Sequence, residues 1–145
     1  IYIIIIYMNK LTEKINNFSK QFTGTNKHVS LFKEDFNFEA RKKEANDVIH
    51  RFPDRIPVIV ERSTQCHDIP LIDKRKYLVP NDINIGQFLW TIRKRLHLDQ
   101  SNALFLFDEH SNIHQNTKVM SNIYEQCKND DNFLYFQYSS ENTFG

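Results

Sequence analysis

The first clear pattern in this chain is a helical repeat between Asn37 and Pro53. Apolar and charged positions alternate there every three or four residues, which predicts an amphipathic helix over 38–52. Asn37 is suited to cap its start, and Pro53 ends it. A shorter helix is predicted to begin at Ser30. The residues that recur at helical spacing are Phe38, Arg41, Ala45, Val48, Ile49 and Phe52.

Two short segments, 56–61 and 76–79, are rich in β-branched and apolar residues and are typical of buried strands. The polar loop 62–73 separates them, and this order predicts an antiparallel pair. Pro57 belongs near a strand start or a sheet edge, because proline cannot donate to the ladder. Pro80 ends the second strand.

The second half of the chain carries further helix and strand signals. A helix is predicted over 85–96, capped by Asp82 or Asn84, with apolar residues at helical spacing. Its apolar positions are Ile85, Phe88, Leu89, Ile92 and Leu96. The next predicted elements are a strand at 104–107, a small strand at Ile113, a helix over 117–127 and a last strand at 133–138.

The resulting order is two helices followed by ββαββαβ. This order predicts an α+β fold in which a mixed sheet wraps around one principal helix. That is the ubiquitin-like β-grasp arrangement, here with two additional N-terminal helices. The last strand is expected in the interior of the sheet, with the C-terminal residues projecting from it as a tail.

Composition narrows the class of protein. A chain of 145 residues that is 40% hydrophobic, with twelve Phe and only three Gly, is long enough and apolar enough for one packed domain. The net charge of +1 argues against a protein built to coat nucleic acid. Basic triplets occur at 41–43, 74–76 and 93–95, but no base-stacking aromatic pattern interleaves them. We therefore expect solvated faces and no nucleic-acid partner.

The N-terminal 29 residues differ from the rest. The apolar run 1–7 is too short to span a bilayer, and it lacks a basic region before it or a small-residue cleavage site after it. Residues 9–29 are polar. We interpret 1–29 as a flexible extension, whose place in the native protein is an open question, and 30–145 as the domain. Cys66 and Cys127 show no pairing pattern, which fits a reducing compartment.

Several blocks of sequence are familiar in their order and spacing. They are FPDRIPVIVE at 52–61, DKRKYLVP at 73–80, IGQF at 85–88, IRKR at 92–95, and the later ALF at 103–105 with the closing Phe-Gly. Together they closely resemble the autophagy ubiquitin-like modifiers, the family that includes the GABA-receptor-associated protein. The resemblance covers roughly residues 30–145.

This resemblance implies conjugation through Gly145. Members are activated and passed between cysteine enzymes as thioesters, and are then joined to the amine of phosphatidylethanolamine. A glycine carboxylate suits this chemistry because no side chain blocks the narrow channel of the activating enzyme. Many members carry residues after this glycine that a cysteine protease removes. The expected partners are thus activating and conjugating enzymes and a processing or deconjugating protease, with the protein in the cytoplasm and, once lipidated, on autophagosomal or other intracellular membranes.

The resemblance also implies capture of receptor peptides with an aromatic-x-x-aliphatic motif, which would add a strand beside 76–79. By position, the pocket for the aromatic residue is matched by Glu44, Val48, Pro57, Lys76, Leu78 and Phe133. The pocket for the aliphatic residue is matched by Tyr77, Val79, Pro80, Ile83, Phe88 and Thr91. A charged rim for acidic flanks is formed by Arg55, Lys74 and Arg95. Thr91 replaces the usual leucine, so we expect a smaller aliphatic partner.

Other chemistry finds little support in the sequence. His110 and His114, with Glu109, are spaced like a metal pair but lie in a predicted turn, and no cysteine is spaced to complete a site. We expect no metal, no cofactor, no catalytic residue and a monomer. The alternative function is a β-grasp trafficking or cytoskeletal adaptor that is never conjugated. Its basic helix at 38–52 would suit acidic partners such as tubulin tails.

Overall fold

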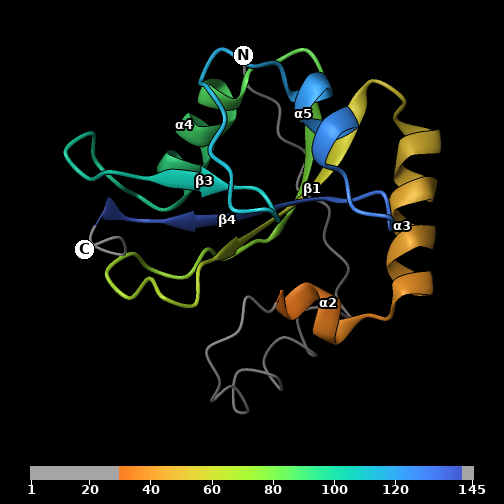
Figure 1. Cartoon of the computed structure of the whole chain (residues 1–145), viewed down its shortest axis with the longest axis horizontal. Helices are drawn as coiled ribbons and strands as arrows, with labels where there is room; N and C mark the ends of the chain where they lie inside the picture. Colours follow the sequence, from red (N-terminus) through yellow and green to blue (C-terminus); the bar gives the residue numbers. More distant parts are fainter. Residues whose placement is uncertain (1–29, 142–145) are drawn as a thin grey trace.

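The computed structural model describes residues 30–141, in which the helices and strands follow the predicted order except for one small strand (Figure 1). The elements are α2 (Leu31–Asp35), α3 (Phe38–Arg51), β1 (Arg55–Arg62), β2 (Lys76–Pro80), α4 (Ile85–Arg95), β3 (Phe105–Phe107), α5 (Met120–Cys127) and β4 (Leu134–Ser139). The predictions made for 1–29 and for Gly145 lie outside the described residues.

Within residues 30–141 the strands form one four-stranded sheet in the order β2-β1-β4-β3. β1 pairs antiparallel with β2 and parallel with β4, and β3 pairs antiparallel with β4. The predicted antiparallel pair and the interior position of the last strand are both confirmed. A mixed sheet with helices packed on it confirms the α+β β-grasp class.

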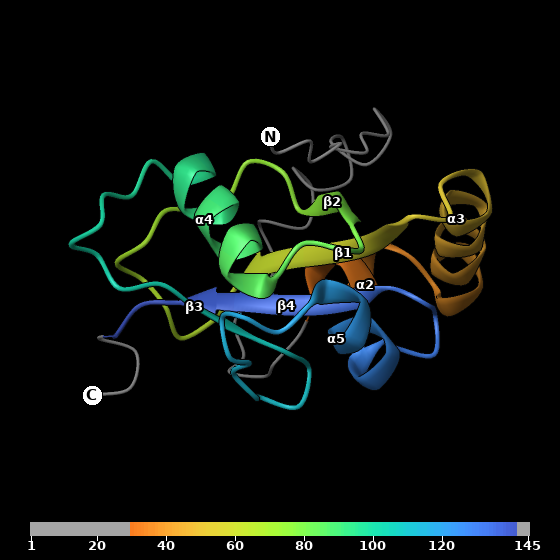
Figure 2. The ribbon, with the colours of Figure 1, turned by 90° about the horizontal axis from the view of Figure 1, so that it is seen from above.

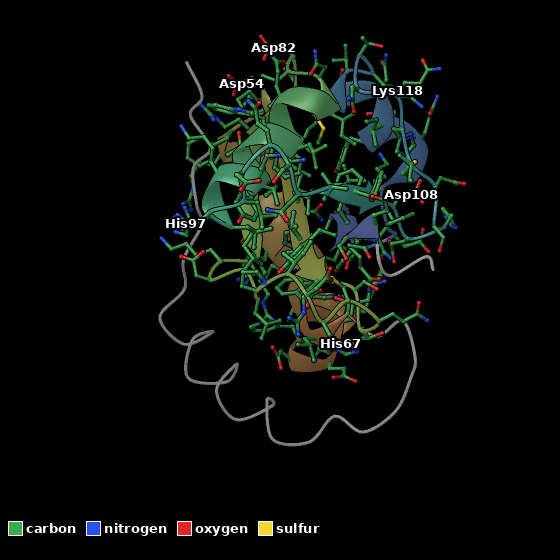
Figure 3. All side chains as sticks on the ribbon, turned by 90° about the vertical axis from the view of Figure 1, so that its left-hand side faces the viewer. Asp54, His67, Asp82, His97, Asp108 and Lys118 are labelled. Carbon is green, nitrogen blue, oxygen red and sulfur yellow. The ribbon has the colours of Figure 1, made fainter. Side chains whose placement is uncertain are left out.

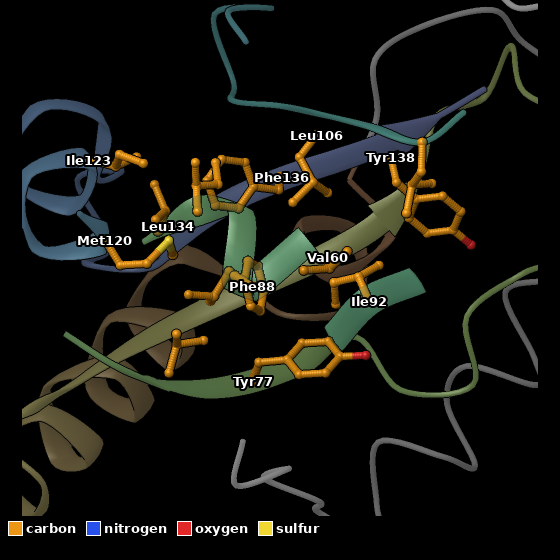
Figure 4. Close-up of a cluster of buried hydrophobic side chains, with 14 of the residues drawn as sticks. Val60, Tyr77, Phe88, Ile92, Leu106, Met120, Ile123, Leu134, Phe136 and Tyr138 are labelled. Carbon is orange, nitrogen blue, oxygen red and sulfur yellow. The ribbon is translucent and has the colours of Figure 1, made fainter. Parts of the chain in front are cut away.

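The sheet has two buried faces, because alternate side chains of each strand point to opposite sides. The main core lies under α4 and α5, where Val60, Phe88, Phe136 and Tyr138 meet (Figure 4). Figure 2 shows α4 and α5 on one side of the sheet and α2 on the other.

The second face carries a smaller aromatic cluster beneath the N-terminal helices. It consists of Phe32, Ala45, Ile59, Phe133 and Tyr135, with Phe36 packed against it. The rings of Phe32 and Phe133 lie edge to face, with their centroids 5.2 Å apart, a favourable arrangement for aromatic pairs. The two N-terminal helices therefore pack onto the sheet and complete the domain.

Local signals locate most helix ends. Asn84, and not Asp82, caps α4: its side chain accepts from the Gln87 backbone at 2.9 Å, while the Gln87 side chain accepts from the Asn84 backbone at 2.9 Å. This reciprocal capping box satisfies two backbone N–H groups that the helix leaves unpaired. Asn37 caps α3 as predicted.

Two predicted elements are wrong in detail. The small strand expected at Ile113 is not formed: this residue lies in a loop and its side chain is 55% exposed. The helix predicted from 117 begins at Met120. The chain before it is held instead by an isolated bridge between Asn84 and Val119, so backbone bonds to the start of α4 take the place of another helical turn.

Candidate functional site

The expected peptide-binding strand lies at the edge of the sheet. Among the described strands, β2 is bonded only to β1, with Pro57 opposite Leu78 and Val58 opposite Tyr77. Its other edge can therefore accept an added strand. Because side chains alternate along β2, Lys76 and Leu78 face the side of α3, while Tyr77 and Val79 join the main core.

A small hollow lies where α3 meets β1 and β2. It contains all of the residues expected for the aromatic pocket, and its lining is Glu44, Val48, Pro57, Lys76, Tyr77, Leu78 and Phe133. Val48, Leu78 and Phe133 are buried, so they form an apolar wall. The chain segments that contribute are far apart in sequence, and only the packing of α3 on the sheet brings them together.

One charged pair bridges this hollow. The Lys76 ammonium donates to the Glu44 carboxylate at 2.7 Å, which links β2 to α3. The same ammonium lies 5.3 Å from the ring centroids of Phe32 and Phe36, within the range of a cation–π contact. The polar edge of the hollow is thus held between the edge strand and both N-terminal helices.

The residues expected for the aliphatic pocket fall into two groups. Tyr77, Val79 and Phe88 are buried in the main core. Pro80, Ile83 and Thr91 are half-buried and lie on or next to β2 and α4. The Thr91 hydroxyl donates to the Gln87 carbonyl at 3.1 Å within its own helix. The hydroxyl proton of Thr91 is therefore already hydrogen-bonded. Toward a peptide, Thr91 differs from leucine mainly in its smaller apolar area.

The expected rim is partly committed to pairs within the molecule. Arg95 makes two contacts to the Asp73 carboxylate, at 3.1 and 3.2 Å. Arg55 and Lys74 are half-buried. Because Asp73 is exposed, its ion pair with Arg95 is accessible to solvent and to an acidic peptide.

The basic triplet 41–43 is divided between interior and surface. Arg41 is buried, and its Nε donates to Asp131 at 2.9 Å while Nη1 donates to the Phe36 carbonyl at 2.6 Å. Asp131 also accepts from the Tyr135 hydroxyl. Burial and this hydrogen bond raise the pKa of Tyr135. Arg41 therefore anchors α2 and α3 to the sheet. It does not contribute to the solvated basic face that the sequence predicted for this triplet.

A second group of polar side chains lies away from β2, at the end of β3 (Figure 3 labels Asp108). Asp108, His114 and Cys127 bring their ligand atoms within 4.8 Å of one another. From the sequence we considered His110 with His114 as a metal pair and expected no metal. In the structure, Asp108 and Cys127 lie beside His114, and His110 is not part of this group. The spacing could not reveal Cys127, because it reaches His114 only through the packing of α5.

Comparison with known proteins decides the family. A family model described as "Autophagy protein Atg8 ubiquitin like" matches residues 40–145. The chain belongs to this Atg8 family. It is therefore an autophagy-related ubiquitin-like protein, as the sequence blocks had indicated.

Named relatives agree with this assignment. Autophagy-related protein 8e of Arabidopsis thaliana is 48% identical over 116 residues, which are 80% of this chain and 93% of the relative. Autophagy-related protein 8 of Schizosaccharomyces pombe is 49% identical over 116 residues, covering 80% and 94%. The crystal structure of Trypanosoma brucei ATG8 matches with a TM-score of 0.75 and 39% identity, covering 81% of this chain and 99% of that one.

Among residues 30–141, no helix combines the length and the apolar character needed to cross a bilayer.

Proposed function

We propose that this Atg8 protein is a modifier conjugated through Gly145 to phosphatidylethanolamine, and that the membrane-bound form captures receptor peptides of the aromatic-x-x-aliphatic type. It would act in autophagosome formation as an adaptor, moving between the cytoplasm and autophagosomal or related intracellular membranes. The observation that carries the peptide-binding half is the edge strand β2 beside the hollow that contains the expected aromatic-pocket residues.

The conjugation half rests on the family, whose match includes Gly145. An activating enzyme and a conjugating enzyme would carry the Gly145 carbonyl as a thioester on a cysteine. The lipid ammonium loses one proton, and the resulting amine attacks this carbonyl. The cysteine sulfur leaves and takes up a second proton as a thiol, while the third stays on the amide nitrogen. An amide to a two-chain lipid gives stable anchoring, which a single acyl chain does not. A cysteine protease would process the precursor or reverse the linkage.

The peptide would bind as an additional strand along β2. Main-chain hydrogen bonds supply affinity in this mode, and pockets for alternate side chains supply specificity. The hollow between α3 and the sheet would take the aromatic side chain. The half-buried surface of Pro80, Ile83 and Thr91 would take the aliphatic one. Acidic residues beside the motif would meet Arg55, Lys74 and Arg95, which should mostly affect the association rate.

Conjugation is tested in a reconstituted reaction. The full chain is incubated with ATP, activating and conjugating enzymes and liposomes that contain phosphatidylethanolamine, and the product is measured by intact mass. The expected result is a mass gain of one lipid that disappears when Gly145 is deleted. The enzymes are first shown to be active on a sister Atg8 protein. With that control in place, the absence of any gain would contradict the modifier and leave the unconjugated adaptor.

Peptide capture is tested separately, on the Gly145-deleted protein, by calorimetric titration. An aromatic-x-x-aliphatic peptide should bind, and replacing either key side chain by alanine should weaken binding. A peptide with methylated backbone nitrogens along the strand that faces β2 is the sharper control, because it keeps the side chains and removes the main-chain donors. Equal affinity of the methylated peptide would rule out strand addition.

The adaptor that binds tubulin tails is the weaker candidate. It relied on the basic helix, but Arg41 of that helix is buried against Asp131. Lys42 and Lys43 share their surface with Glu39 and Asp47, so this face of α3 carries mixed charge.

A further inference from the structure

Three side chains at the end of β3 bring a carboxylate oxygen, an imidazole nitrogen and a sulfur close together. Asp108 Oδ2 lies 2.9 Å from His114 Nε2, and Cys127 Sγ lies 3.5 Å from Asp108 Oδ2 and 3.8 Å from His114 Nε2. A tetrahedral zinc ion, with bonds of about 2.3 Å to sulfur and about 2.0 Å to nitrogen or oxygen, places its ligand atoms about 3.3–3.6 Å apart. We propose that Asp108, His114 and Cys127 bind a zinc ion.

The carboxylate is positioned for this role by its own loop. Asp108 Oδ1 accepts from the backbone N–H groups of His110 at 2.8 Å and Asn112 at 2.9 Å. Oδ2 is thereby directed to His114 and Cys127. The Asp108 side chain is 1% exposed and that of His114 is 10% exposed. Hydrogen bonds that orient a ligating carboxylate are typical supports of metal sites.

The donor set selects the metal. A thiolate, an imidazole and a carboxylate suit zinc, whereas magnesium and calcium take oxygen ligands. The two anionic ligands balance the charge of Zn²⁺, and the proton of the Cys127 thiol passes to water when the sulfur–zinc bond forms. Three protein ligands leave one position of the tetrahedron, which water fills.

The same contacts argue against a catalytic cysteine. In a nucleophile–histidine–carboxylate triad, the nucleophile and the carboxylate contact opposite ring nitrogens. Here Asp108 and Cys127 both contact Nε2 of His114. The cluster therefore converges on one point, as ligands do around an ion.

Zinc at this point would join three parts of the fold. Asp108 follows β3, His114 lies in the following loop, and Cys127 ends α5. The chain just after His114 is bonded to the start of α4, where the Gly86 N–H donates to the Asn116 carbonyl at 3.0 Å. Closing this loop with an ion should stabilise the native state, because the unfolded chain offers no assembled site.

The site is tested with cobalt(II), a spectroscopic substitute for zinc, titrated into the reduced full chain. The expected result is one equivalent of binding with a thiolate-to-cobalt charge-transfer band that zinc displaces, and a higher melting temperature with zinc. Cys127→Ser should remove the band. His114→Ala should weaken affinity by more than about 100-fold, since losing only an outer-shell partner costs about 10–100-fold. His110→Ala and Cys66→Ser are matched controls and should retain the band.

Circular dichroism measures whether each variant is folded. If Cys127→Ser does not fold, Asp108→Asn serves as a second variant of a ligand. Absence of a charge-transfer band in the wild-type chain would overturn the proposal and leave a hydrogen-bonded loop anchor. A band that persists in Cys127→Ser, or that vanishes in Cys66→Ser alone, would also overturn it. Because the readout is metal binding by the chain itself, the result is independent of lipid conjugation and peptide capture.

Discussion

Lys76 on the edge strand and Glu44 on α3 form an ion pair of 2.7 Å across the hollow at the candidate peptide site. The Lys76 side chain is only 6% exposed and that of Glu44 is 20% exposed, so water screens the pair weakly. The pair fixes the distance between β2 and α3, and with it the width of the hollow.

Replacement of Glu44 by Gln should destabilise the fold by about 1 kcal/mol, because the buried ammonium keeps a hydrogen-bond acceptor but loses the opposing charge. Urea unfolding measures the change. Asp47→Asn, on an exposed position of the same helix outside its first turn, is the control and should be nearly neutral. Equal effects of the two substitutions would show that the ion pair contributes no stability of its own.

The Arg41–Asp131 pair should be the most sensitive charged contact of the N-terminal helices. Asp131 is fully buried, so replacing Arg41 by Met leaves a carboxylate without its counter-charge, at a cost of about 3 kcal/mol. A double-mutant cycle with Asp131→Asn should give a strong coupling energy. Lys43→Met, on the exposed side of α3, serves as the control. Additive effects of the two substitutions would contradict the assigned pairing.

Tyr138 should make stability depend on alkaline pH. Its hydroxyl donates to the Pro70 carbonyl at 2.7 Å and accepts from the Ile72 N–H at 2.8 Å, and burial raises its pKa to about 12. The pKa of a tyrosine in an unfolded chain is about 10. The contribution of the Tyr138 hydroxyl to the free energy of unfolding is therefore complete below a pH of about 10. It is lost as the pH rises from there towards about 12.

Tyr138→Phe tests this dependence. The variant should lose about 1–2 kcal/mol at neutral pH, because the Ile72 and Pro70 groups lose their partner. Above pH of about 10 the difference between wild type and variant should shrink. Urea unfolding across the alkaline range gives both quantities, and a constant difference at every pH would contradict the raised pKa.

Thr91→Leu should strengthen binding of peptides whose aliphatic residue is leucine. The substitution restores apolar area of about one or two methylene groups, worth about 1 kcal/mol or roughly fivefold in affinity. The Thr91 hydroxyl bonds to the Gln87 carbonyl within its own helix, so the fold should tolerate the change. Calorimetry with two peptides that differ only in having leucine or valine at the aliphatic position measures the change in size preference. An unchanged preference would place Thr91 outside the aliphatic pocket.

Asp73→Asn should release Arg95 for an acidic peptide. The pair is exposed, so its effect on stability is small, but the freed charge should increase the association rate at low salt. Stopped-flow mixing at low and high ionic strength measures this. Glu125→Gln, an exposed change of the same charge on α5, is the control. A rate increase that survives high salt would not be electrostatic in origin.

Most of the fold was readable from local patterns. The caps at Asn37 and Asn84 follow from local spacing, which the sequence displays directly. The same spacing indicated the buried Ala45 and Val48 of α3, but Phe38 of that set is exposed. Ile113 misled the strand prediction, because one apolar residue in a polar loop carries no periodicity. Its exposure is set by a loop that turns back at Asp108, whose carboxylate accepts from two backbone N–H groups.

The sequence by itself determined the order of elements, the β-grasp class and, through its resemblance, the family and the residues around the hollow. Tertiary structure alone decided that Arg41 is buried against Asp131, that Lys76 meets Glu44, and that Cys127 meets His114 and Asp108. The physical reason is the distance along the chain between the residues that interact. Periodicity records which face of an element is buried, whereas contacts between distant segments depend on how the elements pack.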